Sequence, residues 1–366
     1  MNKSLILAAI LGAAFTSCEN ESENFGFQNQ DENLISFSTP VVGTSSRAGL
    51  SELGYVPGKM ETPIYNLDQD FNVFGMYSEK KGASPVAYID NQLVKYNNST
   101  DVAVWYTEQN YVWPKSGTMT FLAYSPAGAF DDDKDNKKGN VTVEGKNLQI
   151  KDFVVPSEID KQFDLMYTEA QDRNCEGSHE RVQLPFKHAL SCVTFKLSVA
   201  SGNLVAGENT NAVLRSITLH NINDKGNFGK KGWTEQSGQS SYELFNDELA
   251  LTNGVEWNCS NLLLLPQTRT YGSSTIDPKS DAHLEIVWDL YGDNDVKLEQ
   301  RSIVNLGTAT VKGFPVLGKE RDQMEWKKGF AYTYNLTLNL DKIEVEGTFD
   351  EEQWTDFNDK DLDTSL

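Results

Sequence analysis

The stretch Asn33-Leu-Ile-Ser-Phe-Ser-Thr-Pro-Val-Val-Gly-Thr-Ser-Ser-Arg-Ala-Gly49 decides the fold that we expect for this chain. One face of its first half carries Ile35, Phe37, Thr39 and Val41. Side chains alternate with a period of two along a β-strand, so this spacing predicts a strand over residues 35–42. Pro40 has no backbone N–H to donate, which favours an edge strand or a position late in a strand.

A polar loop follows this strand and ends in Ser-Arg-Ala-Gly49. Exposed loops of small polar residues are the usual sites of proteolytic cleavage. Arg47 is the first arginine of the chain, and the next is Arg173, so an arginine-specific protease finds one early target. The bond between Arg47 and Ala48 is therefore the predicted cleavage site. Our hypothesis is that cleavage removes the first strand and that this removal drives assembly.

The N-terminus reads as a targeting segment rather than as part of the fold. Residues 1–17 hold a basic start at Lys3 and an apolar run over Leu5–Phe15 that is too short to span a membrane. The small residues before Cys18 resemble a lipobox, in which the cysteine is acylated, although Phe15 stands where leucine is usual. We expect a signal peptide followed by a lipid anchor in the outer membrane. Ordinary secretory cleavage with a free cysteine is the alternative.

Length and charge limit the classes of protein to which this chain can belong. The 366 residues suggest about two domains. The net charge of −21 disfavours nucleic acid as a partner, because phosphate binding needs basic patches. Short alternating segments separated by Gly-, Asn- and Asp-rich connections predict an all-β protein. We expect two tandem antiparallel β-sandwich domains, at 48–181 and 182–366, after a propeptide at 18–47 that contains the first strand.

The predicted strands are irregularly spaced along the chain and are separated by connections rich in turn residues. They cover Asp70–Tyr77, Tyr88–Tyr96, Ala103–Trp105, Thr118–Tyr124, Val141–Ile150, Phe153–Val155, Val193–Val199, Val213–His220, Tyr242–Phe245, Leu262–Leu265, His283–Tyr291, Arg301–Val304 and Phe330–Leu340. Pro156–Thr168 fits a helix best, although Asp164–Tyr167 within it also fits a strand.

The end of the chain repeats the pattern of its beginning. Alternation in the last long strand puts Tyr332, Tyr334, Leu336, Leu338 and Leu340 on one face. After a bend, Ile343, Val345 and Gly347 begin another alternating stretch ahead of an acidic tail. Such a strand could pair outside its own domain.

The candidate metal and cofactor motifs are incomplete. Cys175 and His179 are near ligand spacing, but no second pair completes a site. Asp131, Asp133 and Asp135 resemble the start of a calcium loop that lacks its glycine and closing glutamate. Residues 313–320 resemble a phosphate loop without the required Ser or Thr. We therefore expect no metal and no cofactor.

The sequence also offers no catalytic constellation. His188 has no serine or cysteine elbow near it, and a hydrolase with a site invisible to spacing rules is the remote alternative. Cys192 lies in an apolar strand and reads as a buried small residue. Together, Cys175, Cys192 and Cys259 allow one disulfide, and the sequence does not show which two of them form it. We expect no enzymatic activity.

Tryptophans support a second hypothesis from another class. Trp105, Trp113, Trp233, Trp257 and Trp288 could form a sugar-binding platform, although core positions are commoner for such side chains. The alternative function is therefore a non-polymerising, glycan-binding outer-membrane surface lipoprotein.

Several pieces together resemble the fimbrillin family, the subunits of type V pili. They are the lipobox-like ending at Cys18, Ile35-Ser-Phe-Ser with Ser-Arg-Ala-Gly49, Trp113-Pro114 leading to Phe121-Leu-Ala-Tyr-Ser-Pro126, Asp164-Leu-Met-Tyr167, Pro185-Phe-Lys-His-Ala-Leu190 and Tyr334-Asn-Leu-Thr-Leu338. Their order and spacing cover nearly the whole chain.

The resemblance implies two transthyretin-like β-domains, lipoprotein export and removal of the first strand by an arginine-specific protease. Ile35, Phe37 and Val41 are then in the expelled strand, and Ile343 and Val345 are in the donor strand that enters a neighbour's vacated groove. The implied partners are other pilin subunits, that protease, the outer membrane through the lipid, and a host or bacterial surface ligand. The implied location is a cell-surface fimbrium that supports adhesion.

Overall fold

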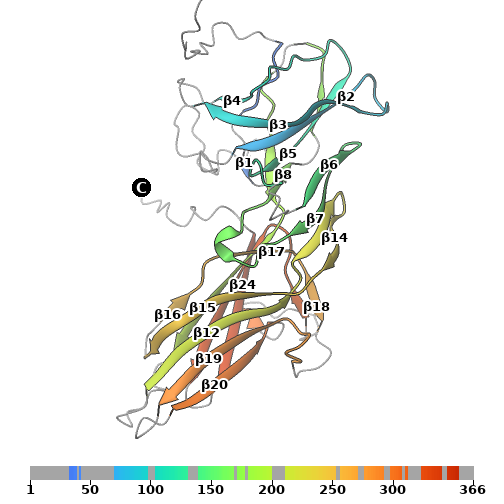
Figure 1. Ribbon diagram of the computed structural model, residues 1–366. Coiled ribbons are helices and arrows are strands. Elements are labelled where there is room, and N and C mark those ends of the chain that lie inside the picture. The colour runs from blue at the N-terminus through green and yellow to red at the C-terminus, as the bar shows by residue number, and fades with distance from the viewer. Residues whose placement is uncertain are drawn as a thin grey trace, which may run out of the picture. The chain divides into compact units, whose positions relative to one another are not determined.

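We describe the protein from a computed structural model (Figure 1). It describes residues 33–38, 41–42, 70–97, 104–130, 139–168, 171–177, 180–199, 211–252, 256–270, 276–291, 297–306, 310–311, 323–339 and 344–353. Contacts divide the chain into two units, 1–32 and 33–366, and every described residue belongs to the second. Within the described residues the secondary structure is β, apart from one 3₁₀ turn, η1 (Ile159–Lys161), so the all-β prediction is confirmed.

The first sheet contains eight strands. Its order is β1 (Val41–Val42), β10 (Pro185–His188), β8 (Met166–Thr168), β5 (Thr118–Ser125), β2 (Phe71–Ser78), β3 (Val86–Asn97) and β4 (Val104–Thr107), with β9 (Gln171–Asn174) beside β5. β2 and β5 lie in the middle and are buried on both faces, which explains their nearly continuous apolar sequence.

A four-stranded sheet corrects part of the strand prediction. It runs β14 (Gly232–Ser237), β13 (Lys225–Gly229), β7 (Asn147–Val154), β6 (Asn140–Glu144). The predicted strand Val141–Ile150 is in fact a hairpin, and β7 continues through the expected break before Phe153. Gly145 explains the turn, because its φ of 63° is a left-handed conformation that glycine adopts without a steric penalty.

The C-terminal half of the chain forms two larger sheets and one small one. The first is β15 (Ser240–Leu251), β12 (Asn211–Ile222), β19 (His283–Tyr291), β20 (Lys297–Asn305), whose strands lie side by side in Figure 1. The second is β16 (Glu256–Asn258), β11 (Ser191–Val199), β23 (Phe330–Asn339), β24 (Glu344–Gln353), β21 (Thr310–Val311), with β17 (Leu262–Leu264) beside β11. β18 (Thr268–Thr270) pairs with β22 (Gln323–Glu325).

Two hydrophobic cores lie on opposite faces of the β2–β5 pair. Phe71 and Phe121 belong to one core, which also contains Phe37. Phe74 and Tyr124 belong to the other, which continues through β11, β12, β19 and β23. This second core draws on the chain before and after Val182. The domain limits 48–181 and 182–366, and their transthyretin-like tandem arrangement, remain predictions.

Two further expectations are resolved within the described ranges. The segment that best fitted a helix contains only η1 and the short strand β8, so the strand alternative for its end is confirmed. The structure also holds no helix long and apolar enough to cross a membrane, as far as its described residues extend.

Candidate functional site

The first described segment, 33–38, is hydrogen-bonded along one side to the chain around β4. The amide of Ile35 donates to the carbonyl of Tyr111 at 2.7 Å, and the amide of Trp113 donates to the carbonyl of Asn33 at 2.7 Å. These two bonds flank the antiparallel partners Leu34 and Val112. Further along, Phe37 lies opposite Trp105 in β4. The segment is thus paired antiparallel with residues about seventy positions away.

The same segment is hydrogen-bonded along its other side. The amide of Ser38 donates to the carbonyl of Val182 at 3.0 Å, and the amide of Val182 donates to the carbonyl of Ser36 at 2.8 Å. This pairing is parallel and continues where β1 pairs with β10, with Val41 opposite Pro185. Residues 33–38 have neighbours on both sides, so the edge alternative is wrong for them. Pro40 lies outside the described residues, and its position late in the strand stays a prediction.

The described parts of segment 33–42, residues 33–38 and 41–42, therefore join the two ends of the first sheet. β10 begins the path β10-β8-β5-β2-β3-β4, and β4 ends it. The segment contacts β10 through β1 and β4 through Phe37. Its removal leaves a gap with unpaired backbone groups on both sides, and unpaired strand edges are templates for another strand. We call this gap the closing groove.

The side chains of the segment fill the floor of the closing groove. Ile35 is 6% exposed and Phe37 is fully buried, whereas Ser36 and Ser38 are half-buried. The alternation read from the sequence is confirmed for residues 35–38. The Phe37 ring lies edge-on to Phe71 and Phe121, with centroids 6.1 and 5.9 Å apart. Burying a side chain of this size stabilises the fold by about 1.5–3 kcal/mol.

The predicted donor segment lies in its own sheet. β24 pairs antiparallel with β23 over ten residues, and Val345 lies opposite Leu338. On β23, Tyr334, Leu336 and Leu338 are buried, as the alternation predicted. To donate its strand to another chain, β24 has to leave β23.

The other residues predicted to matter for assembly lie outside the described residues. They are Cys18, Arg47, Ala48 and Ile343. The calcium-like turn at Asp131–Asp135, the phosphate-loop-like residues 313–320 and His179 are also outside.

The tryptophans do not form the platform that the glycan hypothesis needs. Trp105, Trp113 and Trp288 are 0%, 7% and 1% exposed and are core residues. Trp233 and Trp257 are half-buried, and the Trp233 indole N–H donates to the carbonyl of Ala189. These large apolar rings pack in or against the two cores, which stabilises the fold and takes them out of reach of a ligand. The glycan-binding hypothesis therefore loses its proposed binding surface.

The cysteines and His188 are structural groups. Cys175, Cys192 and Cys259 are all free thiols, so the possible disulfide does not form. Burial raises the pKa of the Cys259 thiol to about 11, which keeps it protonated and unreactive at neutral pH. The His188 Nδ1 lies 2.8 Å from an Asp164 carboxylate oxygen, and its side chain is only 3% exposed, so substrate cannot reach it.

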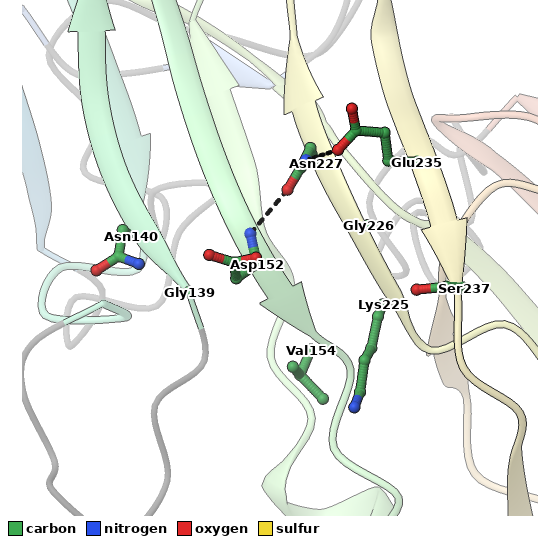
Figure 2. A pocket seen from close by; sticks show the side chains of 9 residues that line it. All are labelled: Gly139, Asn140, Asp152, Val154, Lys225, Gly226, Asn227, Glu235 and Ser237. Carbon is green, nitrogen blue, oxygen red and sulfur yellow. Dashed lines mark hydrogen bonds between the residues drawn. The ribbon is translucent and has the colours of Figure 1, made fainter.

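A polar hollow over β6, β7, β13 and β14 is a feature that the sequence did not reveal (Figure 2). It encloses about 560 Å³. The Asp152 amide donates to the Asn227 side chain at 2.8 Å, and the Asn227 side chain donates to Glu235. Asp152 and Glu235 both have left-handed φ values, 55° and 51°. Residues so far apart share no spacing signal, and the hollow offers polar hydrogen-bonding groups rather than a reactive pair.

Comparison with known proteins identifies the class to which this fold belongs. The model of the fimbrillin-like family matches residues 63–354, so the chain belongs to that family. This is a family of structural fimbrial proteins rather than of enzymes. No curated protein matches the chain.

A solved structure with a TM-score above 0.5 shows the same fold. A fimbrial protein from Bacteroides vulgatus is 14% identical with a TM-score of 0.56, and the match covers 88% of this chain and 100% of that one. A putative cell adhesion protein from Bacteroides uniformis is 14% identical with a TM-score of 0.45, covering 88% of this chain and 98% of that one. At such identities the first similarity is evidence of the fold alone.

Proposed function

We propose that this chain is a structural pilus subunit that polymerises by exchanging one β-strand for another in the closing groove. The observation that carries the proposal is the two-sided pairing of segment 33–42 across the ends of the first sheet. A segment so placed is separable from the rest of the sheet, yet its absence leaves an apolar slot and open backbone groups. The apolar slot and the open backbone groups both favour binding of a strand from a second molecule.

The N-terminal events of the proposal follow from the sequence. Residues 1–17 direct export, Cys18 carries the lipid that holds the precursor in the outer membrane, and residues 18–47 form the propeptide. An arginine-specific protease cuts between Arg47 and Ala48 and releases Ile35, Phe37 and Val41 with the propeptide. The location after cleavage is a cell-surface fimbrium, and its outer face meets a host or bacterial surface ligand.

The donor strand of the proposal is the segment around Ile343 and Val345. Its alternating positions Ile343, Val345, Gly347 and Phe349 have the period of two found in the expelled strand. A strand with that period can place its apolar side chains where Ile35 and Phe37 lay. The contact is head-to-tail and does not close on itself, so it generates a filament of pilin subunits.

Cleavage can be tested on the purified precursor with an arginine-specific protease. The matched control is Arg47→Lys, which keeps the charge but removes the target bond. We expect mass spectrometry to find a new N-terminus at Ala48 in the wild-type chain, together with heat-resistant ladders on gels. The variant should keep its propeptide and remain monomeric. Equal ladders from Arg47→Lys, or assembled fibres whose chains still begin at Cys18, would contradict the proposal.

A further inference from the structure

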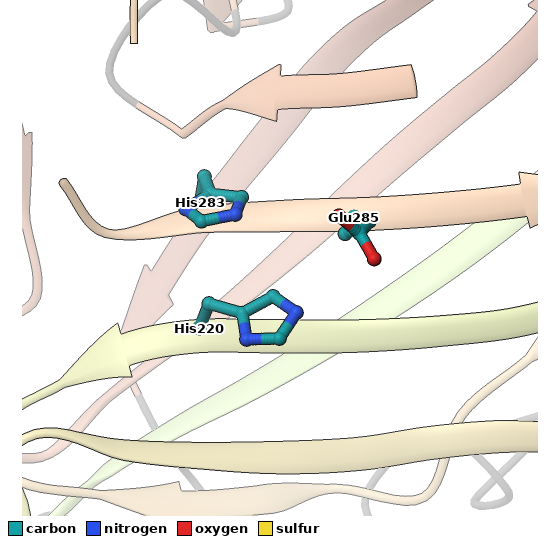
Figure 3. A group of neighbouring side chains, drawn as sticks. All are labelled: His220, His283 and Glu285. Atoms are coloured by element: carbon teal, nitrogen blue, oxygen red, sulfur yellow. The ribbon is translucent and has the colours of Figure 1, made fainter. Parts of the chain in front are cut away.

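Three metal-binding side chains lie together on the sheet that contains β12 and β19 (Figure 3). His220 of β12 and His283 of β19 are direct register partners, and Glu285 follows two positions after His283 on the same face. The nitrogen and oxygen atoms that they offer all lie within 4.8 Å of one another. Sequence spacing could not reveal the group, because the two histidines lie on different strands.

Each histidine is held by a hydrogen bond through its Nδ1 atom. In His283 this atom lies 2.7 Å from the carbonyl oxygen of Asp281. A carbonyl only accepts, so Nδ1 carries the proton and Nε2 keeps its lone pair. In His220 the Nδ1 atom lies 2.9 Å from the Ser241 hydroxyl. A hydroxyl can accept as well as donate, and in the tautomer in which Nδ1 donates to it, Nε2 also keeps its lone pair. Outer hydrogen bonds of this kind orient the histidines of known metal sites.

The packing of the group limits how far its members can move. His283 is only 2% exposed, and its ring stacks on that of His220 with centroids 4.9 Å apart. Glu285 is more open, with 20% of its side chain exposed, and forms an ion pair with Arg301 at 3.4 Å. His283 is thus the most constrained of the three, whereas the half-buried His220 and the Glu285 carboxylate can adjust.

We propose that His220, His283 and Glu285 form a binding site for a zinc ion. Two imidazole nitrogens and one carboxylate form a ligand set that suits zinc, whereas calcium and magnesium prefer oxygen ligands alone. In a tetrahedral site, ligands that are each about 2.1 Å from the zinc ion lie about 3.4 Å apart. The three ligand atoms, which lie within 4.8 Å of one another, therefore have to approach by up to roughly 1.4 Å, and the stacked rings have to tilt so that both lone pairs point at the ion. The fourth position is open to water or to a donor atom from another molecule.

Arg301 competes with the zinc ion for the Glu285 carboxylate. It neutralises Glu285 when no cation is bound, and a zinc ion has to displace it from the carboxylate. Removing the arginine therefore frees a ligand without deleting one. A purely structural histidine–glutamate cluster makes no such prediction, so Arg301 separates the two interpretations.

The test is isothermal titration of the untagged chain with zinc chloride. We expect one zinc ion per chain, and at least tenfold weaker binding in His220→Gln and in Glu285→Gln. Arg301→Gln should bind as tightly as the wild type or more tightly. The matched controls are His179→Gln, which removes an imidazole that belongs to neither β12 nor β19, and Glu299→Gln, which removes an exposed carboxylate from β20.

Circular dichroism and thermal unfolding in the presence of a chelator should confirm that all variants remain folded. His283 is left unchanged because its burial makes any replacement a threat to folding. No zinc binding by the folded wild-type chain would overturn the proposal. Binding that survives both His220→Gln and Glu285→Gln, or that is lost equally in the two controls, would also overturn it.

Discussion

At the scale of single residues, Phe37 ties the removable segment to the core. It is fully buried and contacts Phe71 of β2 and Phe121 of β5, the two central strands of the first sheet. The precursor therefore contains part of its core in a segment that the proposed protease discards. The mature chain should be incomplete until another strand supplies an equivalent side chain.

Phe37→Ala should destabilise the precursor by about 3–5 kcal/mol, because it leaves a cavity between Phe71 and Phe121. The measurement is urea unfolding of the uncleaved chain. Ser36→Ala, on the half-buried face of the same segment, should change stability by no more than about 0.5 kcal/mol. After cleavage at Arg47 the two variants should become indistinguishable. A loss below about 1 kcal/mol for Phe37→Ala would show that the segment adds little to the core.

The sequence predicted which side chains of segment 33–38 are buried, but it did not predict the residues with which this segment pairs. Alternation correctly placed Ile35 and Phe37 inside and Ser36 outside, because the period of a strand is local. It could not show that this segment pairs with both Tyr111 and Val182, since those contacts depend on the whole sheet. The zinc ligands His220 and His283 were missed for the same reason.

At the scale of elements, strands with strong local signals were predicted well. β19 matches its predicted range, and β5 differs by one residue at its end. The hairpin β6–β7 was missed because apolar residues on either side of Gly145 read as one strand. The lengths of β12 and β15 were underestimated, since their pairing is interrupted by irregular register shifts that obscure the alternation.

Gly117 limits how the chain enters β5, which carries Phe121 to the closing groove. Its φ is 87°, and a Cβ atom there would lie 2.4 Å from the backbone oxygen of Ser78. Gly82 has a similar φ of 84° but open space around it. Gly82→Ala should cost about 1 kcal/mol from backbone strain alone.

Gly117→Ala should cost at least about 2 kcal/mol, because the backbone of β2 has to shift as well. Thermal unfolding of the two variants measures the difference directly. Equal losses would mean that the contact between Gly117 and Ser78 is relaxed at no cost, and that β5 does not depend on this close approach.

At the scale of the whole molecule, segment 33–42 pairs with both end strands of the first sheet, β10 through β1 and β4 through Phe37. Residues 1–47 contribute −3 to the net charge of −21, so subunits cleaved after Arg47 carry −18 and repel one another. Assembly has to be driven by a local gain that exceeds this repulsion. Filling the closing groove supplies such a gain, since it satisfies backbone groups on two sides and buries apolar side chains. The charge was evident from composition. The pairing of one segment with both end strands of the sheet could not be predicted, because it depends on residues far apart in the sequence.

A reversible disulfide between Leu34→Cys and Val112→Cys tests this claim most directly. The hydrogen bonds from Ile35 and to Asn33 flank this pair, so its Cα atoms should be about 4.5 Å apart, within the range for a disulfide. Neither side chain is in the buried core, and Val112 is 48% exposed. Val112→Cys alone is the control.

After cleavage at Arg47, the oxidised double variant should retain segment 33–42 and remain monomeric in size-exclusion chromatography. Adding a reductant should release the segment and start polymerisation, while the single variant should polymerise under both conditions. Polymerisation of the oxidised, fully cross-linked chain at the wild-type rate would contradict the claim that the closing groove has to be emptied before a neighbour can bind.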